Sequence, residues 1–124
     1  MKKLTLLIAM LIATSTHAET AITPEDLPPW LKPELLVHIS AMEMNQSQIK
    51  EFREGIKVCV SGLQRVVKRE IRKGGVNIPK RIKRGINRQY TELDKRMKAI
   101  LTESQLEPWA SYLEGLKLVM AERA

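Results

Sequence analysis

The stretch QSQIKEFREGIKVCVSGLQRVVKREIRK, residues 46–73, determines the expected fold. Its apolar residues recur at steps of three and four, at Ile49, Phe52, Ile56, Cys59, Leu63, Val66 or Val67, and Ile71. This spacing places them on one face of a single long helix. Gly74 and Gly75 come next, and they predict the end of the helix because glycine is favoured just past a helix C-terminus.

Two more helical patterns follow this one. In the first, Asn77 is the expected N-cap and Pro79 suits the opening turn. Its apolar residues are Ile82, Ile86, Tyr90 or Gln89, Leu93, Met97 and Ile100, and those of the second pattern are Leu106, Trp109 or Ala110, Leu113, Leu116 and Met120. Since no alternating run and no Asn-Gly or Asp-Gly hairpin turn is present, the sequence predicts an all-α fold.

Upstream, LPPWLKPELLVHISAM, residues 27–42, begins with a Pro-rich lead. Residues before proline are biased away from helix, so we expect residues 19–32 to form an extended arm. A short helix over 33–41 would then open a helical domain of residues 33–124. The 46–73 helix would be about 42 Å long at 1.5 Å per residue, whereas a compact domain of this size measures about 26 Å across. We therefore expect an elongated helical hairpin of three main helices plus a short leading helix, paired with a second copy that covers its apolar surface.

The first 18 residues have the features of a secretory signal. Lys2 and Lys3 precede an apolar run over residues 4–12, and Thr16-His17-Ala18 ends the segment with a small residue at the cleavage position. The apolar run is shorter than the roughly 20 residues that a membrane-spanning helix needs. We expect residues 1–18 to be a signal peptide that is cleaved after Ala18, which places the remaining chain in the periplasm.

Charge is distributed unevenly along the chain. Residues 65–98 contain 13 Lys or Arg and three acidic residues, whereas residues 19–64 and 99–124 are each slightly acidic. The predicted client-binding basic face consists of Arg65, Lys68, Arg69, Arg72, Lys73, Lys80, Arg81, Lys83, Arg84 and Arg88. Like charges at this density cost stability unless an anionic partner offsets them. The alternative is that these side chains only solvate the outer faces of the helices.

Two helix starts share one pattern. Thr102-x-x-Gln105, with Leu101 before it, predicts a capping box in which the Thr side chain accepts a backbone N–H bond and Gln reaches back. Asn45-x-x-Gln48, preceded by Met44, fits the same description. Such a cap contributes about 1 kcal/mol. Two copies suggest a repeated helical unit.

The segments MNQSQIKEFREGI, residues 44–56, and INRQYTELDKRMKAILTESQLEPW, residues 86–109, resemble the LTxxQ family of periplasmic proteins (Spy/CpxP-like). The likeness extends over residues 40–116. Met44 and Asn45 replace the Leu-Thr of the family pattern in the first copy. Pro108 replaces a plain helix former in the second copy, which predicts a loose first turn and a helix that restarts at Pro108.

The resemblance implies an antiparallel, cradle-shaped homodimer that holds unfolded or stress-damaged envelope proteins without ATP on a basic, partly apolar surface. It also implies an alternative, a regulatory adaptor for the periplasmic sensor domain of an envelope-stress kinase. Binding to an anionic membrane surface is a further alternative that the basic amphipathic helices leave open. The expected partners are unfolded or acidic periplasmic proteins and a second copy of the chain.

Other functions find little support in the sequence. After residue 18 the chain has one histidine, His38, so we expect no metal site, and it has neither a Ser/His/Asp set nor a Gly-rich phosphate loop. We therefore expect no enzyme activity and no cofactor. Export and the lack of a recognition motif argue against nucleic acid. Cys59 has no partner within the chain, and is either buried or bonded to a second chain.

Overall fold

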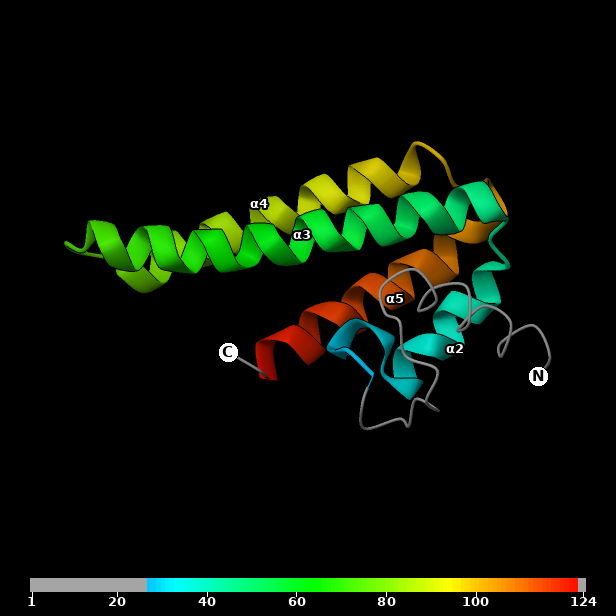
Figure 1. Cartoon of the computed structure of the whole chain (residues 1–124), viewed down its shortest axis with the longest axis horizontal. Coiled ribbons are helices and arrows are strands. Elements are labelled where there is room, and N and C mark those ends of the chain that lie inside the picture. The colour runs from blue at the N-terminus through cyan, green and yellow to red at the C-terminus, as the bar shows by residue number, and fades with distance from the viewer. Residues whose placement is uncertain (1–26, 123–124) are drawn as a thin grey trace, which may run out of the picture. The chain divides into compact units, whose positions relative to one another are not determined.

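The structure, a computed structural model, describes residues 27–122, and this part of the chain contains helices and no strand. The elements are η2 (Pro29–Leu31), α2 (Pro33–Met42), α3 (Gln46–Lys73), α4 (Ile78–Lys98) and α5 (Glu103–Glu122) (Figure 1). The predicted all-α class, with one short leading helix and three main helices, is confirmed. Among the described residues, no helix is both long enough and apolar enough to cross a membrane.

The predicted signal peptide and the first eight residues of the predicted arm lie outside the described residues. The last residues of the arm are not fully extended, because Pro29–Leu31 form the 3₁₀ turn η2. Leu31 is buried, and the backbone oxygen of Trp30 accepts a hydrogen bond of 2.9 Å from the Tyr112 hydroxyl. The arm therefore packs onto α5, as its apolar residues allow, and does so through one short helical turn.

The described chain divides into two compact units. The first consists of the residues up to Ile49 together with those from Leu101 onward, and the second spans Lys50–Ile100. In the first unit α2 packs on α5 and η2 contacts both helices. The largest fully buried side chains of this unit are Leu35, Ile39, Met42, Trp109, Tyr112 and Leu116. The rings of Trp109 and Tyr112 stack, with their centroids 5.8 Å apart. Burial of these large side chains is the main source of the unit's stability.

The helix α5 runs through Pro108 without interruption. The prediction that this helix restarts at Pro108 is therefore wrong. Proline removes one backbone hydrogen bond from a helix. Here the buried side chains of Gln105 and Trp109 hold the turns on either side of it, so packing outweighs the lost bond.

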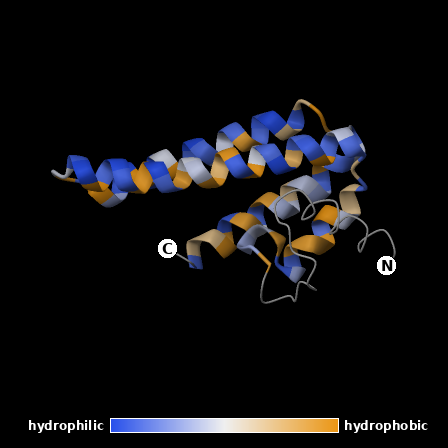
Figure 2. Ribbon diagram, in the orientation of Figure 1, coloured by the Kyte–Doolittle hydropathy of each residue, from blue (hydrophilic) through white to orange (hydrophobic). Residues whose placement is uncertain are grey.

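The second unit is a hairpin of two antiparallel helices, formed by α4 and the part of α3 from Lys50 onward (Figure 1). Hydrophobic and hydrophilic residues alternate along both ribbons (Figure 2), as expected for helices that each present one apolar face. Glycine permits close contact: a Cβ added to Gly85 would lie 2.6 Å from Val66 Cγ1. The buried apolar residues of this unit are Phe52, Ile56, Cys59, Leu63, Val66, Tyr90, Leu93 and Met97.

The apolar interface of this hairpin weakens toward the Gly74–Gly75 turn. Ile71, predicted on the buried face, is 62% exposed, and Ile82 and Ile86 are only half-buried. The acidic residue Glu70 is buried in their place. A buried carboxylate is costly unless a charged group pairs with it. Arg81 provides that group.

Candidate functional site

All ten residues of the predicted basic face lie in the second unit, on the last turns of α3 and the first turns of α4. The helices are antiparallel, with Val66 against Gly85 and Glu70 against Arg81. The two groups of cations are therefore brought to the same end of the hairpin. We call residues 65–88 the basic end.

Glu70 is the one acidic residue of the basic end, and its charge is already satisfied. Its Oε1 lies 2.9 Å from Arg81 Nε and its Oε2 lies 3.2 Å from Arg69 Nε. Burial raises the pKa of the Glu70 carboxyl, but hydrogen bonds from Arg81 and Arg69 and the nearby charge of Lys73 outweigh it and lower the pKa below its ordinary value. Glu70 therefore stays ionised at neutral pH, and its ion pairs are those with Arg81 and Arg69.

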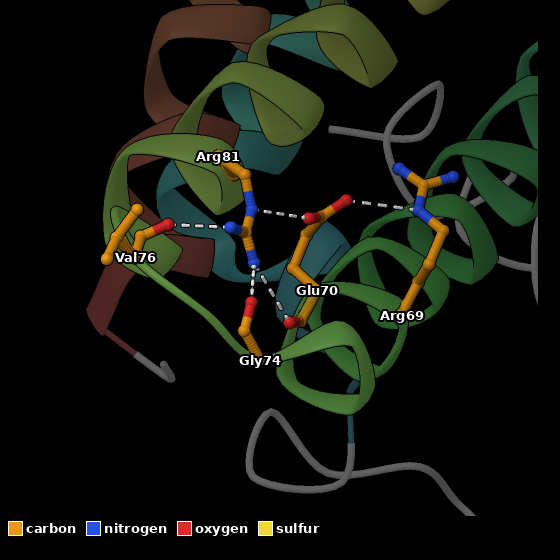
Figure 3. Close-up of polar contacts among 5 residues, drawn as sticks. All are labelled: Arg69, Glu70, Gly74, Val76 and Arg81. Carbon is orange, nitrogen blue, oxygen red and sulfur yellow. Dashed lines mark hydrogen bonds and ion pairs between the residues drawn. The ribbon is translucent and has the colours of Figure 1, made fainter.

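Arg81 binds the turn between the helices (Figure 3). Its guanidinium donates to the backbone oxygens of Val76 and Gly74, each at 2.6 Å, and to the Glu70 backbone oxygen at 3.4 Å, in addition to the Glu70 carboxylate. The planar fork of arginine suits several acceptors at once. Arg81 is therefore only half-exposed, and its main role is to stabilise the turn rather than to bind a partner.

The turn adopts backbone conformations that its sequence permits. Gly74 and Gly75 have φ of 63° and 87°, where a side chain would be strained. Asn77 is at the N-cap position of α4, with φ of 61°, but its side chain makes no capping hydrogen bond. The prediction that Asn77 is the N-cap residue is confirmed, although its side chain does not form the capping bond. Asparagine tolerates the left-handed region, and in this conformation it contributes its backbone oxygen, which accepts from Arg81 N.

Eight of the ten predicted cations are exposed and form no ion pair with any residue in 27–122: Arg65, Lys68, Arg72, Lys73, Lys80, Lys83, Arg84 and Arg88. A solvating surface usually mixes both signs, and this one does not. The same region exposes two apolar side chains, Ile71 at 62% and Val76 at 78%. The basic end thus combines unpaired positive charge with exposed apolar surface.

The first capping motif forms in full at the start of α3. The backbone N–H of Gln48 donates to Asn45 Oδ1 at 2.8 Å, and Asn45 N–H donates to Gln48 Oε1 at 3.0 Å. Met44 before the cap is buried. The pair satisfies two backbone donors that a helix start leaves open.

The second motif forms only in half. Thr102 N–H donates to Gln105 Oε1 at 2.8 Å, as predicted, but the Thr102 hydroxyl lies 3.2 Å from both Gln105 Oε1 and Ser104 Oγ, and Gln105 N–H bonds the Thr102 backbone oxygen instead. The predicted acceptor role of the Thr102 side chain is therefore wrong. Leu101 before this cap is half-buried.

The two motif glutamines bond to one another, a contact that the capping pattern alone does not predict. Gln48 Nε2 donates to Gln105 Oε1 at 2.8 Å, and Gln105 Nε2 donates to Gln48 Oε1 at 3.0 Å and to the Met42 backbone oxygen at 2.9 Å. Both side chains are buried. The signal in the sequence was the repetition itself, since two helix starts with the same polar residue can be joined through that residue.

Cys59 is a buried free thiol, 3% exposed, whose sulfur lies 3.9 Å from the Gln89 backbone oxygen. Of the two alternatives for this residue, the structure supports burial. Burial raises the pKa of the Cys59 thiol to about 11, so the nucleophilic thiolate is disfavoured. Within residues 27–122, no group of three or more His, Cys, Asp or Glu residues could hold a metal ion.

The basic end is suited to non-covalent binding of anions and of anionic chains with apolar residues. Its lysines and arginines can form charge-assisted hydrogen bonds with carboxylates or phosphates. No protein-family model, curated protein or solved structure matches the chain. The function must therefore be argued from the residues themselves.

Proposed function

We propose that this chain is an ATP-independent, chaperone-like binding protein of the periplasm that holds unfolded or stress-damaged envelope proteins. The observation that carries the proposal is the basic end, where eight exposed cations form no ion pair with any residue in 27–122 and lie in the same segment as exposed Ile71 and Val76. The resemblance to the LTxxQ family (Spy/CpxP-like) points to the same activity. A homodimer would cover part of the apolar surface, as that resemblance implies.

Physical chemistry supports a weak, general mode of holding. Unpaired charges attract acidic chains over a long range and speed their encounter, while a few apolar contacts keep them bound. Release then needs no ATP, because each contact is weak by itself. Added salt should weaken the holding, since exposed charges are screened over about 10 Å at 0.1 M ionic strength.

The experiment that tests the proposal is an aggregation assay with an unrelated acidic protein that unfolds on warming. The test variant carries Arg65→Glu, Lys68→Glu and Arg84→Glu, which spares Arg81 and Arg69 because these bind Glu70. The matched control carries Lys50→Glu, Lys57→Glu and Lys95→Glu, three exposed residues outside the basic end with the same change in net charge.

We expect the unmodified chain to suppress aggregation at near-stoichiometric ratio, the test variant to lose most of this effect, and the control to keep it. Equal activity of all three proteins would remove the basic end from the mechanism. If the unmodified chain does not suppress aggregation, yet binds one sensor domain saturably, the function of regulatory adaptor replaces that of chaperone.

A further inference from the structure

The turn between α3 and α4 presents apolar side chains to solvent. Val76 is the most exposed large hydrophobic residue among residues 27–122, at 78%, and Ile71 is exposed at 62%. The two lie five residues apart, with Arg72, Lys73 and the two glycines between them. We call residues 71–80 the hairpin tip.

Hydrogen bonds from Arg81 anchor the backbone of the hairpin tip. Arg81 donates to the backbone oxygens of Gly74 and Val76, and its Nε also donates to the Glu70 carboxylate (Figure 3). Ordering a loop on binding costs conformational entropy, and a loop that is already ordered avoids that cost. These bonds therefore fix the backbone of Val76, while its side chain is 78% exposed and adds little packing within the chain.

Positive charge surrounds these apolar side chains. Arg72 and Lys73 end α3, and Lys80, Lys83 and Arg84 lie on the first turns of α4, all of them exposed and outside any ion pair in the described chain. Glu70, the nearest acid in sequence, is bonded to Arg81 and Arg69. A partner of the hairpin tip must therefore be anionic at its surface and apolar just beneath.

We propose that the hairpin tip docks on an anionic phospholipid bilayer, with Val76 and Ile71 entering the interfacial region and the surrounding cations meeting the headgroup phosphates. Basic residues near an anionic leaflet and shallowly buried apolar side chains act together in this mode of binding. It uses exposed side chains to which the proposed function also assigns client holding, and it would place the chain at the membrane surface.

A folded protein partner with a matched interface fits the hairpin tip less well. Cores of protein interfaces are enriched in aromatic residues, Met and Arg, and their strongest contacts come from Trp, Tyr and Arg. Of these residue types the hairpin tip has only Arg72, and its exposed apolar side chains are two aliphatic ones. Fluid acyl chains accept such side chains without any matched pocket.

The test is co-sedimentation of the chain starting at Glu19 with vesicles of phosphatidylcholine and phosphatidylglycerol in equal parts, and with vesicles of phosphatidylcholine alone. Residues 1–18 are left out because their apolar run would itself bind lipid. The test variant is Ile71→Ser with Val76→Ser. The matched control is Val37→Ser with Leu118→Ser, which removes two apolar side chains of similar exposure, 60% and 68%, from α2 and α5 without changing net charge.

We expect binding to the mixed vesicles only, a partition coefficient about tenfold lower for the test variant, and no change for the control. Val76→Phe should raise the partition coefficient, and it covers the case in which the double serine variant folds poorly. The proposal is overturned if the unmodified chain ignores the mixed vesicles, if the test variant binds as the unmodified chain does, or if the control weakens equally. It is also overturned if the test variant loses aggregation suppression while vesicle binding persists, since the hairpin tip would then serve polypeptides.

Discussion

The side-chain amides of Gln48 and Gln105, 57 residues apart, form a reciprocal buried pair in which each Nε2 donates to the other's Oε1. Each Oε1 also accepts the backbone N–H of its own helix cap, from Asn45 and Thr102 respectively. Those backbone donors fix which amide atom is oxygen, so the orientation of the pair follows from the caps. The starts of α3 and α5 are thus joined by the same two residues that cap them.

Gln105→Ala should be one of the most destabilising changes to a polar residue in this chain. It removes the bonds that Gln105 makes with the Met42 oxygen and the Thr102 N–H, and it breaks both bonds between the two glutamine side chains. Unsatisfied buried groups cost about 1–3 kcal/mol each to leave unpaired, so we expect a loss of roughly 2–4 kcal/mol.

Urea unfolding of Gln48→Ala, Gln105→Ala and the double variant measures this directly. The double variant should lose less than the two single losses added together, because the first substitution already breaks the pair. Additive losses would show that the glutamines act only as separate caps.

Arg81→Lys should destabilise the hairpin although the charge is kept. Lysine presents a single ammonium group and cannot reach the Val76 and Gly74 oxygens and the Glu70 carboxylate together. Losing the two short bonds to backbone oxygens should cost about 2 kcal/mol, at about 1 kcal/mol each. Arg84→Lys, at an exposed arginine outside ion pairs, is the matched control and should unfold at the same urea concentration as the unmodified chain. If both variants unfold alike, Arg81 does not hold the turn.

Helical periodicity was sufficient to predict where the helices lie. The steps of three and four give the correct extent of α3 and its stop at Gly74, because one buried face leaves a repeating mark in the sequence. The second pattern continues to Ile100, two residues past the end of α4 at Lys98. Ile71 shows the limit of this reasoning. It continues the apolar pattern but is exposed, because helix pairing near a turn depends on which residues of the other helix stand opposite.

The roles of individual polar residues were harder to predict, since they depend on contacts between distant positions. Arg81 belongs to the basic face by composition, yet it binds Glu70 and the turn. Thr102 matches the capping pattern, yet its hydroxyl does not accept the Gln105 N–H. A sequence pattern identifies residues that can form such bonds, but it does not identify the residues with which they form them.

Glycines at the α3–α4 contact should differ sharply in their tolerance of alanine. Alanine favours helix over glycine by about 1 kcal/mol, so the fit of the added methyl group decides the sign. At Gly85 the new Cβ would lie 2.6 Å from Val66 Cγ1. Because the β-branched valine has few rotamers to move into, we expect a net loss of stability of roughly 1–3 kcal/mol. At Gly62 the new Cβ would meet the flexible end of the Gln89 side chain, which can move away. We therefore expect the stability of Gly62→Ala to change little or to increase. Thermal unfolding of the two variants tests this order, and a Gly85→Ala protein as stable as Gly62→Ala would contradict it.

Acid should destabilise the protein as Glu70 and Glu51 take up protons. Burial raises the pKa of Glu70 but its hydrogen bonds from Arg81 and Arg69 lower it further, while hydrogen bonding to Arg96 lowers that of Glu51. Because the folded pKa values lie below the unfolded ones, the unfolded chain binds protons first as pH falls through about 4.5. The stability contributed by these groups is present at neutral pH and is lost as pH drops through the folded values.

Urea unfolding between pH 7 and pH 3 measures this loss as a fall in the free energy of unfolding. A Glu70→Gln protein should be less stable than the unmodified chain at pH 7 and should show a shallower decline toward pH 3. A decline of unchanged slope in Glu70→Gln would assign the acid sensitivity to other carboxylates.

Alkaline pH should act on the buried Cys59 and Tyr90. Burial raises the pKa of the Cys59 thiol to about 11 and that of the Tyr90 hydroxyl to about 12. The unfolded groups lose their protons earlier, near pH 9 and pH 10, so the stability due to the neutral thiol is intact below about pH 9 and declines as pH rises toward 11. At pH 8 the folded thiol should resist a disulfide-exchange reagent, react fully in urea, and give no dimer on a non-reducing gel. Rapid reaction of the folded protein at pH 8, or a dimer that disappears on reduction, would show that Cys59 is accessible.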